Sequence, residues 1–173
     1  NYTYAKYGAR ILAQPGQFAW QVFDQQVAHL LRDEYRITQV TKVSADTLEA
    51  LAQQLDDVDP QGFLETVRSY NAAVDRSKTF NPNIKDGRST DGLAVNKSNW
   101  ANVLDTPPFE AYAVTCGITF TFGGLRTNPQ AEVIGTNQQA IGGLYAAGEI
   151  VGGLFYFNYP GGSGLTNGAV FGR

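Results

Sequence analysis

Hydrophobic and polar positions alternate with different periods along the first third of the chain, and each period predicts an element. Residues 19–23 are aromatic and β-branched and predict a short strand. After Asp24, which can cap a helix, apolar residues at helical spacing predict a helix that ends near Tyr35. Residues 37–43 alternate apolar and polar and predict a second, half-buried strand.

Two further helices are predicted before residue 75. Ser44 or Asp46 can cap the first of them, which has leucines on one face. The pair Asp59-Pro60 is a cap followed by proline at the first helical position. The helix that follows this pair carries apolar residues at helical spacing, namely Phe63, Val67, Tyr70 and Val74. Residues 77–105 are polar and rich in turn signals, and we expect a long loop there.

The last third of the chain is predicted to consist mainly of strands. We expect strands over residues 112–122, 131–134 and 144–147. A helix over residues 165–171 is predicted to start in the glycine-rich segment 161–164. The fold class is therefore α+β.

Composition changes near residue 108. Residues 1–116 hold 25 of the 29 charged side chains, whereas residues 117–173 hold 14 of the 19 glycines. Thr106-Pro107-Pro108 favours an extended linker between these regions. We therefore expect two domains, over residues 1–108 and 109–173.

Bulk properties exclude several classes of protein. An apolar fraction of 43% with 17% charged residues excludes a disordered chain. The net charge of −3 gives no reason to expect a nucleic-acid partner, and no apolar run approaches the ~20 residues of a membrane span. One cysteine, Cys116, with one histidine, His29, builds neither an internal disulfide nor a Cys/His zinc site, so no metal is predicted. No signal peptide opens the chain, and we expect a cytoplasmic protein.

The chain contains no methionine and begins at Asn1. A trimmed N-terminus would explain this, and so would excision from a larger protein. The apolar stretch at the C-terminal end favours the second interpretation, so we expect a fragment.

The segment from Gly143 to Gly164 is the richest in candidate chemistry. A small-residue strand ends in Gly148-Glu149, and a glycine-rich turn then opens a helix. Such a turn lets a ligand approach the backbone, and a helix N-terminus presents N–H groups to an anion or a flavin carbonyl. A tight strand-to-helix connection without a ligand would look the same. The G-x-G-x-x-G dinucleotide fingerprint is absent, because Asn167 stands at its last position.

The tract from Gly143 to Arg173, with Gly123-Gly124-Leu125-Arg126 upstream, resembles the C-terminal part of fumarate reductase/succinate dehydrogenase-type flavoproteins. Within them it is most similar to the tricarballylate dehydrogenase branch. Residues 11–24 resemble the start of that family's capping domain. The resemblance implies a capping domain over residues 1–108, followed by the C-terminal β-rich segment of the FAD-binding domain over residues 109–173.

The resemblance also implies FAD as the cofactor and assigns residues to it. Glu149, with Gly148 before it, stands where the family binds the ribityl chain of FAD. Gly164 and Leu165 stand where the family's backbone N–H groups reach the flavin pyrimidine ring, beside a helix dipole that stabilises negative charge.

The substrate side departs from fumarate reductases. Tyr159 stands where they carry a carboxylate-binding arginine, Phe120 where they carry histidine, and Tyr4 near the place of their capping-domain arginine. A phenol cannot replace a bidentate carboxylate clamp. The tyrosines are instead similar to those of 3-ketosteroid dehydrogenases. That similarity implies Tyr4 as the catalytic base, Tyr159 as the donor to a ketone oxygen, and Phe120 and Gly162 as substrate-binding residues. Packing roles among nine tyrosines are the alternative.

The expected function is hydride transfer between flavin N5 and a carboxylate or ketone substrate, as α,β-dehydrogenation or the reverse reduction. The Rossmann half that would hold the pyrophosphate of FAD is not in this chain, so the chain alone is expected to be inactive. Its expected partners are a small-molecule substrate, the missing N-terminal half and, through an exposed apolar face, further copies of itself. A fumarate reductase proper and a non-catalytic α+β binding or structural module remain as alternatives.

Overall fold

The computed structural model describes residues 6–118, 121–156 and 159–172, which form two compact units. The first unit holds Ile11–Thr115. Among the described residues, the second unit holds 6–10 and 116–172. The short helix α1 (Tyr7–Leu12) contributes residues to both.

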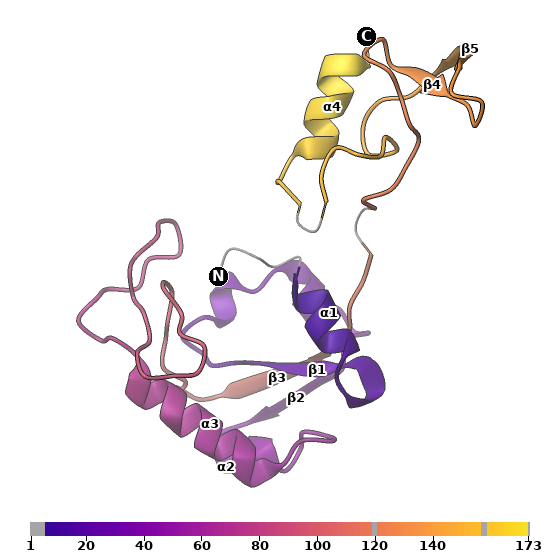
Figure 1. The fold of residues 1–173 in the computed structure, drawn as a ribbon. Helices are drawn as coiled ribbons and strands as arrows, with labels where there is room; N and C mark the ends of the chain where they lie inside the picture. Colours follow the sequence, from indigo (N-terminus) through magenta and orange to yellow (C-terminus); the bar gives the residue numbers. More distant parts are fainter. Residues whose placement is uncertain (1–5, 119–120, 157–158, 173) are drawn as a thin grey trace. The chain divides into compact units, whose positions relative to one another are not determined.

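A three-stranded antiparallel sheet organises the first unit (Figure 1). Its strands are β1 (Ala19–Phe23), β2 (Lys42–Ala45) and β3 (Phe109–Val114), in the order β1-β3-β2. Strand β3 is the central one, although it comes last in the sequence. The compact units therefore divide after Thr115, whereas the domain boundary predicted from the sequence falls at residue 108.

Two helices with side-chain caps lie on one side of this sheet (Figure 1). Helix α3 (Pro60–Ala73) starts as predicted, because the carboxylate of Asp59 accepts the N–H groups of the first turn. Helix α2 (Leu48–Ala52) is capped by Thr47, whose hydroxyl accepts the N–H of Ala50 at 3.1 Å. The predicted caps of α2, Ser44 and Asp46, were wrong.

The hydrophobic core of the first unit lies between α2 and β3. Leu51 and Leu55 pack against Phe109 and Ala111, and Phe63 of α3 is packed against this cluster. A second cluster joins the end of α3 to the segment before β3, and its members are Val74, Ala101 and Val103. The inward residues of β3 thus hold the sheet against the helices.

The predicted helix over residues 24–35 was wrong. The segment contains only two short 3-10 turns, η3 (Ala28–Leu30) and η4 (Asp33–Arg36). Its expected cap, Asp24, is 3% exposed and accepts N–H groups of Asp105 and Thr106, 81 and 82 residues ahead. Its other oxygen accepts the N–H of Gln26 at 3.1 Å, as a cap would, but the chain that follows continues only as 3-10 turns. The next strand begins at Lys42 and not at residue 37.

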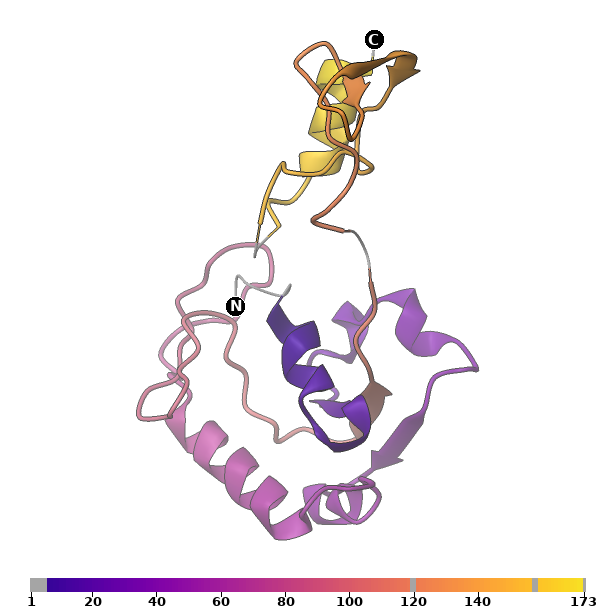
Figure 2. The same cartoon turned by 45° about the vertical axis from the view of Figure 1, so that its right-hand side comes forward.

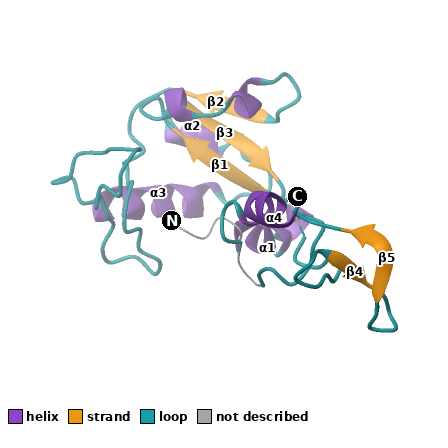
Figure 3. Cartoon of the chain, turned by 90° about the horizontal axis from the view of Figure 1, so that it is seen from above, coloured by secondary structure: helices purple, strands orange, loops and turns teal. Residues whose placement is uncertain are grey.

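The loop predicted over residues 77–105 is confirmed, and Figures 2 and 3 show it as a long irregular excursion after α3. Asp86 organises it. The carboxylate accepts backbone N–H groups of Asn81, Arg88 and Trp100 at 2.9–3.1 Å. Burial acts to raise the pKa of Asp86, but together these hydrogen bonds outweigh it and leave the pKa below its ordinary value.

The second unit contains a hairpin and one helix. Strands β4 (Glu132–Ile134) and β5 (Ala140–Tyr145) pair antiparallel, and α4 (Ser163–Phe171) follows a glycine-rich connection. The predicted helix here is confirmed, whereas the strand predicted over 144–147 lies earlier, in β5. Within the described residues, no helix has the length and apolar character that crossing a membrane requires.

Candidate active site

A buried asparagine joins the end of the hairpin to helix α4. The side-chain oxygen of Asn167 accepts the backbone N–H of Gly148 at 2.5 Å. Asn167 is 8% exposed. A buried side-chain amide needs hydrogen-bond partners, so this bond fixes the half-buried turn at Gly148 against the helix.

The turn places Glu149 against the first turn of α4. Gly164 is buried, and a Cβ atom built on it would overlap the carboxylate of Glu149. The carboxylate of Glu149 can lie here because residue 164 is a glycine and has no side chain. Glu149 itself is exposed.

The segments around Gly124 and Gly152 approach each other closely. Gly124 and Gly152 flank the isolated parallel bridge between Leu125 and Val151. A Cβ on Gly124 would lie 2.7 Å from the N atom of Gly152, and one on Gly152 would lie 2.5 Å from the N atom of Gly124. Neither backbone can yield easily, so glycine is required at both positions.

Helix α4 begins without a capping side chain. Its N-cap is Gly162, at a φ of 86° that favours glycine. The N–H groups of Gly164 and Leu165 lie in the first turn, where no carbonyl of the helix can accept them. Leu165 is 84% exposed. An oxygen acceptor from outside the helix can therefore bind here, at the positive end of the helix dipole.

Tyr159 lies at the same helix end. Its hydroxyl oxygen accepts the N–H of Gly162 at 3.1 Å. Its ring packs edge-to-face with Phe155, with centroids 5.1 Å apart, and Phe155 packs in the same way against Phe122 at 5.4 Å. These contacts hold the phenol at one end of a row of aromatic rings.

The structure thus brings most of the predicted residues to one place. Six of them lie around the N-terminal turn of α4, namely Gly148, Glu149, Tyr159, Gly162, Gly164 and the exposed Leu165. Tyr4 and Phe120 lie outside the described residues. From the sequence, no role was assigned to Asn167. Asn167 is the residue that breaks the dinucleotide fingerprint, and this departure could have marked it as a candidate.

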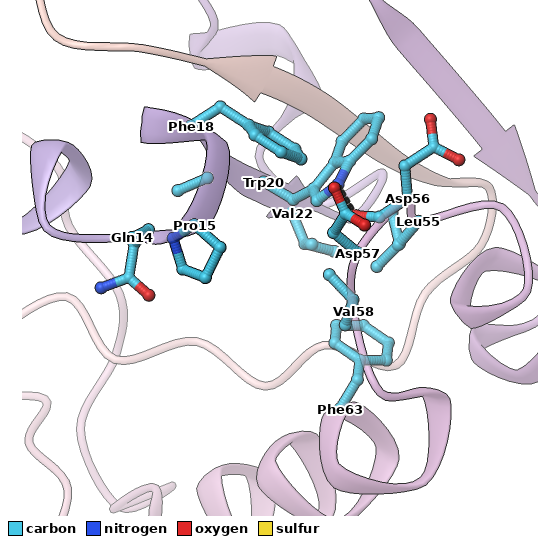
Figure 4. A pocket seen from close by; sticks show the side chains of 11 residues that line it. Gln14, Pro15, Phe18, Trp20, Val22, Leu55, Asp56, Asp57, Val58 and Phe63 are labelled. Carbon is cyan, nitrogen blue, oxygen red and sulfur yellow. Dashed lines mark hydrogen bonds between the residues drawn. The ribbon is translucent and has the colours of Figure 1, made fainter.

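Two cavities of the first unit are lined by none of the predicted site residues that the structure describes. One of about 310 Å³ lies between Phe18 and Trp20 on one side and Val58 and Phe63 on the other (Figure 4). The indole N–H of Trp20 donates to the Asp56 carbonyl at 3.1 Å at its edge. In the part of the chain that the structure describes, no cluster of His, Cys, Asp and Glu side chains could hold a metal ion.

Comparison with known proteins decides the family. The family model described as FAD binding domain matches residues 5–165. The chain belongs to the FAD binding domain family. A curated relative, the fumarate reductase (cytochrome) of Shewanella frigidimarina, is 34% identical over 173 residues, which are 99% of this chain and 28% of that protein. The chain is therefore related to fumarate reductase/succinate dehydrogenase-type flavoproteins, and it spans little more than a quarter of this relative's length.

Solved structures agree with this assignment. The open conformation of a flavocytochrome c3 fumarate reductase matches with a TM-score of 0.67 and 31% identity, covering 98% of this chain and 28% of that one. The 3-ketosteroid Δ1-dehydrogenase of Sterolibacterium denitrificans matches with a TM-score of 0.69 and 25% identity, covering 98% and 34%. Both structural neighbours are named as oxidoreductases, and this chain has the mixed helix and sheet that its sequence predicts.

The cofactor of this FAD binding domain is FAD, and the residues at the start of α4 fit it. The uncapped N–H groups of Gly164 and Leu165 are donors suited to a flavin carbonyl oxygen. The carboxylate of Glu149 lies beside them, in the space that a side chain at residue 164 would fill, and is an acceptor suited to a hydroxyl.

Proposed function

We propose that this chain is the substrate-covering and C-terminal part of a longer FAD-dependent oxidoreductase, which moves a hydride between flavin N5 and a carboxylate or ketone substrate. The observation that carries the proposal is the placement of Glu149 against Gly164 at the uncapped start of α4. This arrangement brings one acceptor, from Glu149, beside the two N–H donors in the first turn of α4. The capping domain and the FAD-binding segment are proposed assignments for the two units.

In this proposal each group has one task. FAD supplies the hydride chemistry when bound. Glu149 accepts a hydrogen bond from a ribityl hydroxyl, and the N–H groups of Gly164 and Leu165 donate to a carbonyl oxygen of the pyrimidine ring. The dipole of α4 favours negative charge at that oxygen. Asn167 positions the turn by holding Gly148.

Tyr159 is proposed to act on the substrate. Because its oxygen accepts the N–H of Gly162, the O–H bond is the part of the phenol that would donate to a substrate carbonyl. A phenol donor suits a ketone better than a dicarboxylate, which arginine binds in bidentate fashion. Tyr4, as proton-accepting base, and Phe120 complete the proposed site.

Exposed apolar residues of the second unit support the proposal that a further part of the parent protein packs against it. Every residue of β5 is exposed, with Ile141 at 44% and Leu144 at 45%. On α4, Val170 is 48% exposed and Phe171 is 39% exposed. The N-terminal half of the parent protein is the proposed cover for these side chains, and self-association is what we expect in its absence.

A complementation experiment tests the proposal. The purified chain is titrated with FAD while flavin fluorescence is followed, and the titration is repeated with the separately expressed N-terminal half of the parent. We expect weak or no binding by the chain alone and a bound-flavin spectrum with dye reduction when both halves are present. Failure of both halves together to bind flavin would favour the non-catalytic module.

A fumarate reductase proper is the second candidate, because the curated relative at 34% identity is one. Fumarate, tricarballylate and an enone ketone should be compared as substrates of the full-length parent. The ketone reaction is expected to fall at least tenfold in Tyr159→Phe. Efficient fumarate reduction that Tyr159→Phe leaves unchanged would support the second candidate. Membership of the tricarballylate dehydrogenase branch is a proposal that this comparison also tests.

A further inference from the structure

The first unit contains a second cavity, of about 390 Å³, whose mostly apolar lining includes one cation, Lys97. Its walls come from the segment after β1, from α3 and from the long loop. The apolar lining includes Val27, Leu31, Phe80, Trp100 and Val103. The polar lining is formed by Asp24, Tyr70, Lys97 and Asn102. The volume lies within the range of about 300–1,000 Å³ that is typical of small-molecule sites.

Lys97 is held in place by its own backbone. Its N–H donates to the hydroxyl of Thr90 at 2.8 Å, and its carbonyl accepts the N–H of Thr90 at 3.0 Å. Thr90 is 4% exposed. These bonds fix the backbone of residue 97 beside the cavity that its side chain lines.

The ammonium group of Lys97 can donate more hydrogen bonds than the one found within the described residues. It donates to the carbonyl of Trp100 at 3.1 Å, which engages one of its three N–H bonds. Burial lowers the pKa of Lys97, and the charge of Asp86 acts against this shift. The carboxylate of Asp86 is already bound to three backbone N–H groups. An incoming anion would therefore restore stabilisation that the partly desolvated cation lacks.

The other charged group of the lining, Asp24, does not compete for Lys97. Its carboxylate accepts four hydrogen bonds, from the side chain and backbone of Gln26 and from the N–H groups of Asp105 and Thr106. No ion pair between Asp24 and Lys97 is found within the described residues. The phenol of Tyr70 also lines the cavity and can donate to an anion.

We propose that this cavity binds an apolar monocarboxylate, with the carboxylate on Lys97 and Tyr70 and the hydrocarbon part among Val27, Leu31 and Phe80. The site lies wholly in the first unit, contains no residue of the proposed flavin site, and goes beyond the proposed function. The charge of Lys97 favours a carboxylate over a neutral or cationic ligand of the same shape.

Tryptophan fluorescence of the whole chain tests this proposal, since the chain has two tryptophans and only Trp100 lines this cavity. Octanoate and octylammonium are titrated below their micelle-forming concentrations, and octan-1-ol is titrated below its solubility limit. We expect a saturable signal with octanoate that persists in Trp20→Phe and is lost in Trp100→Phe. Octanoate should bind at least about tenfold more tightly than octan-1-ol, as expected for a hydrogen-bonded ion pair. Equal binding of octanoate and octan-1-ol, or no saturable signal, would overturn the proposal.

Variants of the lysine give the matched comparison. Lys97→Met should reduce octanoate affinity to that of octan-1-ol, Lys97→Arg should retain most of it, and the exposed Lys78→Met should not change it. Octanoate binding that Lys97→Met leaves unchanged would contradict the assignment. If Lys97→Met does not fold, as judged by circular dichroism, the comparison of octanoate with octan-1-ol on the unchanged chain decides the question.

Discussion

The side chain of Asn167 accepts the backbone N–H of Gly148 at 2.5 Å, and this bond joins residues 19 positions apart. The bond connects the turn at Gly148-Glu149 to helix α4. The carboxylate of Glu149 lies against the first turn of the same helix. The proposed flavin contacts on both segments depend on this connection.

Replacing Asn167 by leucine should free the turn. The half-buried N–H of Gly148 would lose its acceptor, which costs about 1 kcal/mol. Amide hydrogen exchange should become faster at Gly148 in Asn167→Leu and change much less in Asn167→Asp, which keeps an acceptor oxygen. Equal exchange rates in both variants would show that the bond does not hold the turn.

Two glycine substitutions should separate folding from cofactor binding. In Gly124→Ala the new Cβ meets the backbone near Gly152, so we expect a loss of several kcal/mol of stability. In Gly164→Ala it meets only the mobile end of Glu149, so stability should change by less than about 1 kcal/mol. Flavin affinity of the parent should nevertheless fall in Gly164→Ala, because the carboxylate is displaced. Thermal unfolding and FAD titration of the two variants measure these effects.

Asp24 should matter to stability more than a typical surface carboxylate. Asp24→Ala leaves the N–H groups of Asp105 and Thr106 without their acceptor, and we expect a loss of about 2–3 kcal/mol in the free energy of unfolding. The exposed Asp33, paired with Arg36, is the control, and Asp33→Ala should cost less than about 0.5 kcal/mol. Urea unfolding compares the two, and similar losses would contradict the role given to Asp24.

The pair of Lys42 and Glu110 should make stability depend on pH. Burial acts to raise the pKa of Glu110, but hydrogen bonds from Lys42 and Tyr112 outweigh it and leave the pKa lowered. A lowered carboxyl pKa stabilises the fold above its ordinary value of 4.5, and this stabilisation is lost as the pH falls through the lower, folded-state value. The pKa of Lys42 is raised above 10.5 by its hydrogen bond to Glu110, so its contribution disappears only at still higher pH.

Glu110→Gln should therefore flatten the acid side of the stability profile, between about pH 5 and pH 3. Since the pair is partly exposed, we expect a loss of about 1 kcal/mol at neutral pH. Glu49→Gln, in an exposed pair with Arg68, is the matched control and should leave the profile unchanged. An unchanged acid limb in Glu110→Gln would contradict the effect of this pair.

Local signals in the sequence predicted the elements whose boundaries are set by adjacent residues. Helix α3 begins at Asp59-Pro60 and α4 follows the glycines at 161–162, as predicted, because caps and turns act over a few residues. The helix expected after Asp24 was wrong, since only 3-10 turns follow it. The carboxylate of Asp24 accepts the N–H of Gln26, as a cap would, but it also binds partners at residues 105 and 106. Such partners are visible only when the chain has folded.

The candidate site was predictable to a similar extent. The glycine-rich turn and Glu149 stand out in the sequence, since a run of glycines before a helix signals close approach of the backbone. The bond between Asn167 and Gly148 and the cavity around Lys97 depend on contacts between distant segments. Neither leaves a periodic pattern in the sequence.

The FAD affinity of Glu149→Ala in the full-length parent protein tests the central claim most directly. The account predicts that binding weakens at least tenfold relative to the unchanged protein, because an acceptor for a ribityl hydroxyl is removed. Glu65→Ala, on the exposed side of α3, serves as control and should bind FAD normally. Unchanged FAD affinity in Glu149→Ala would contradict the assignment of this turn to the flavin.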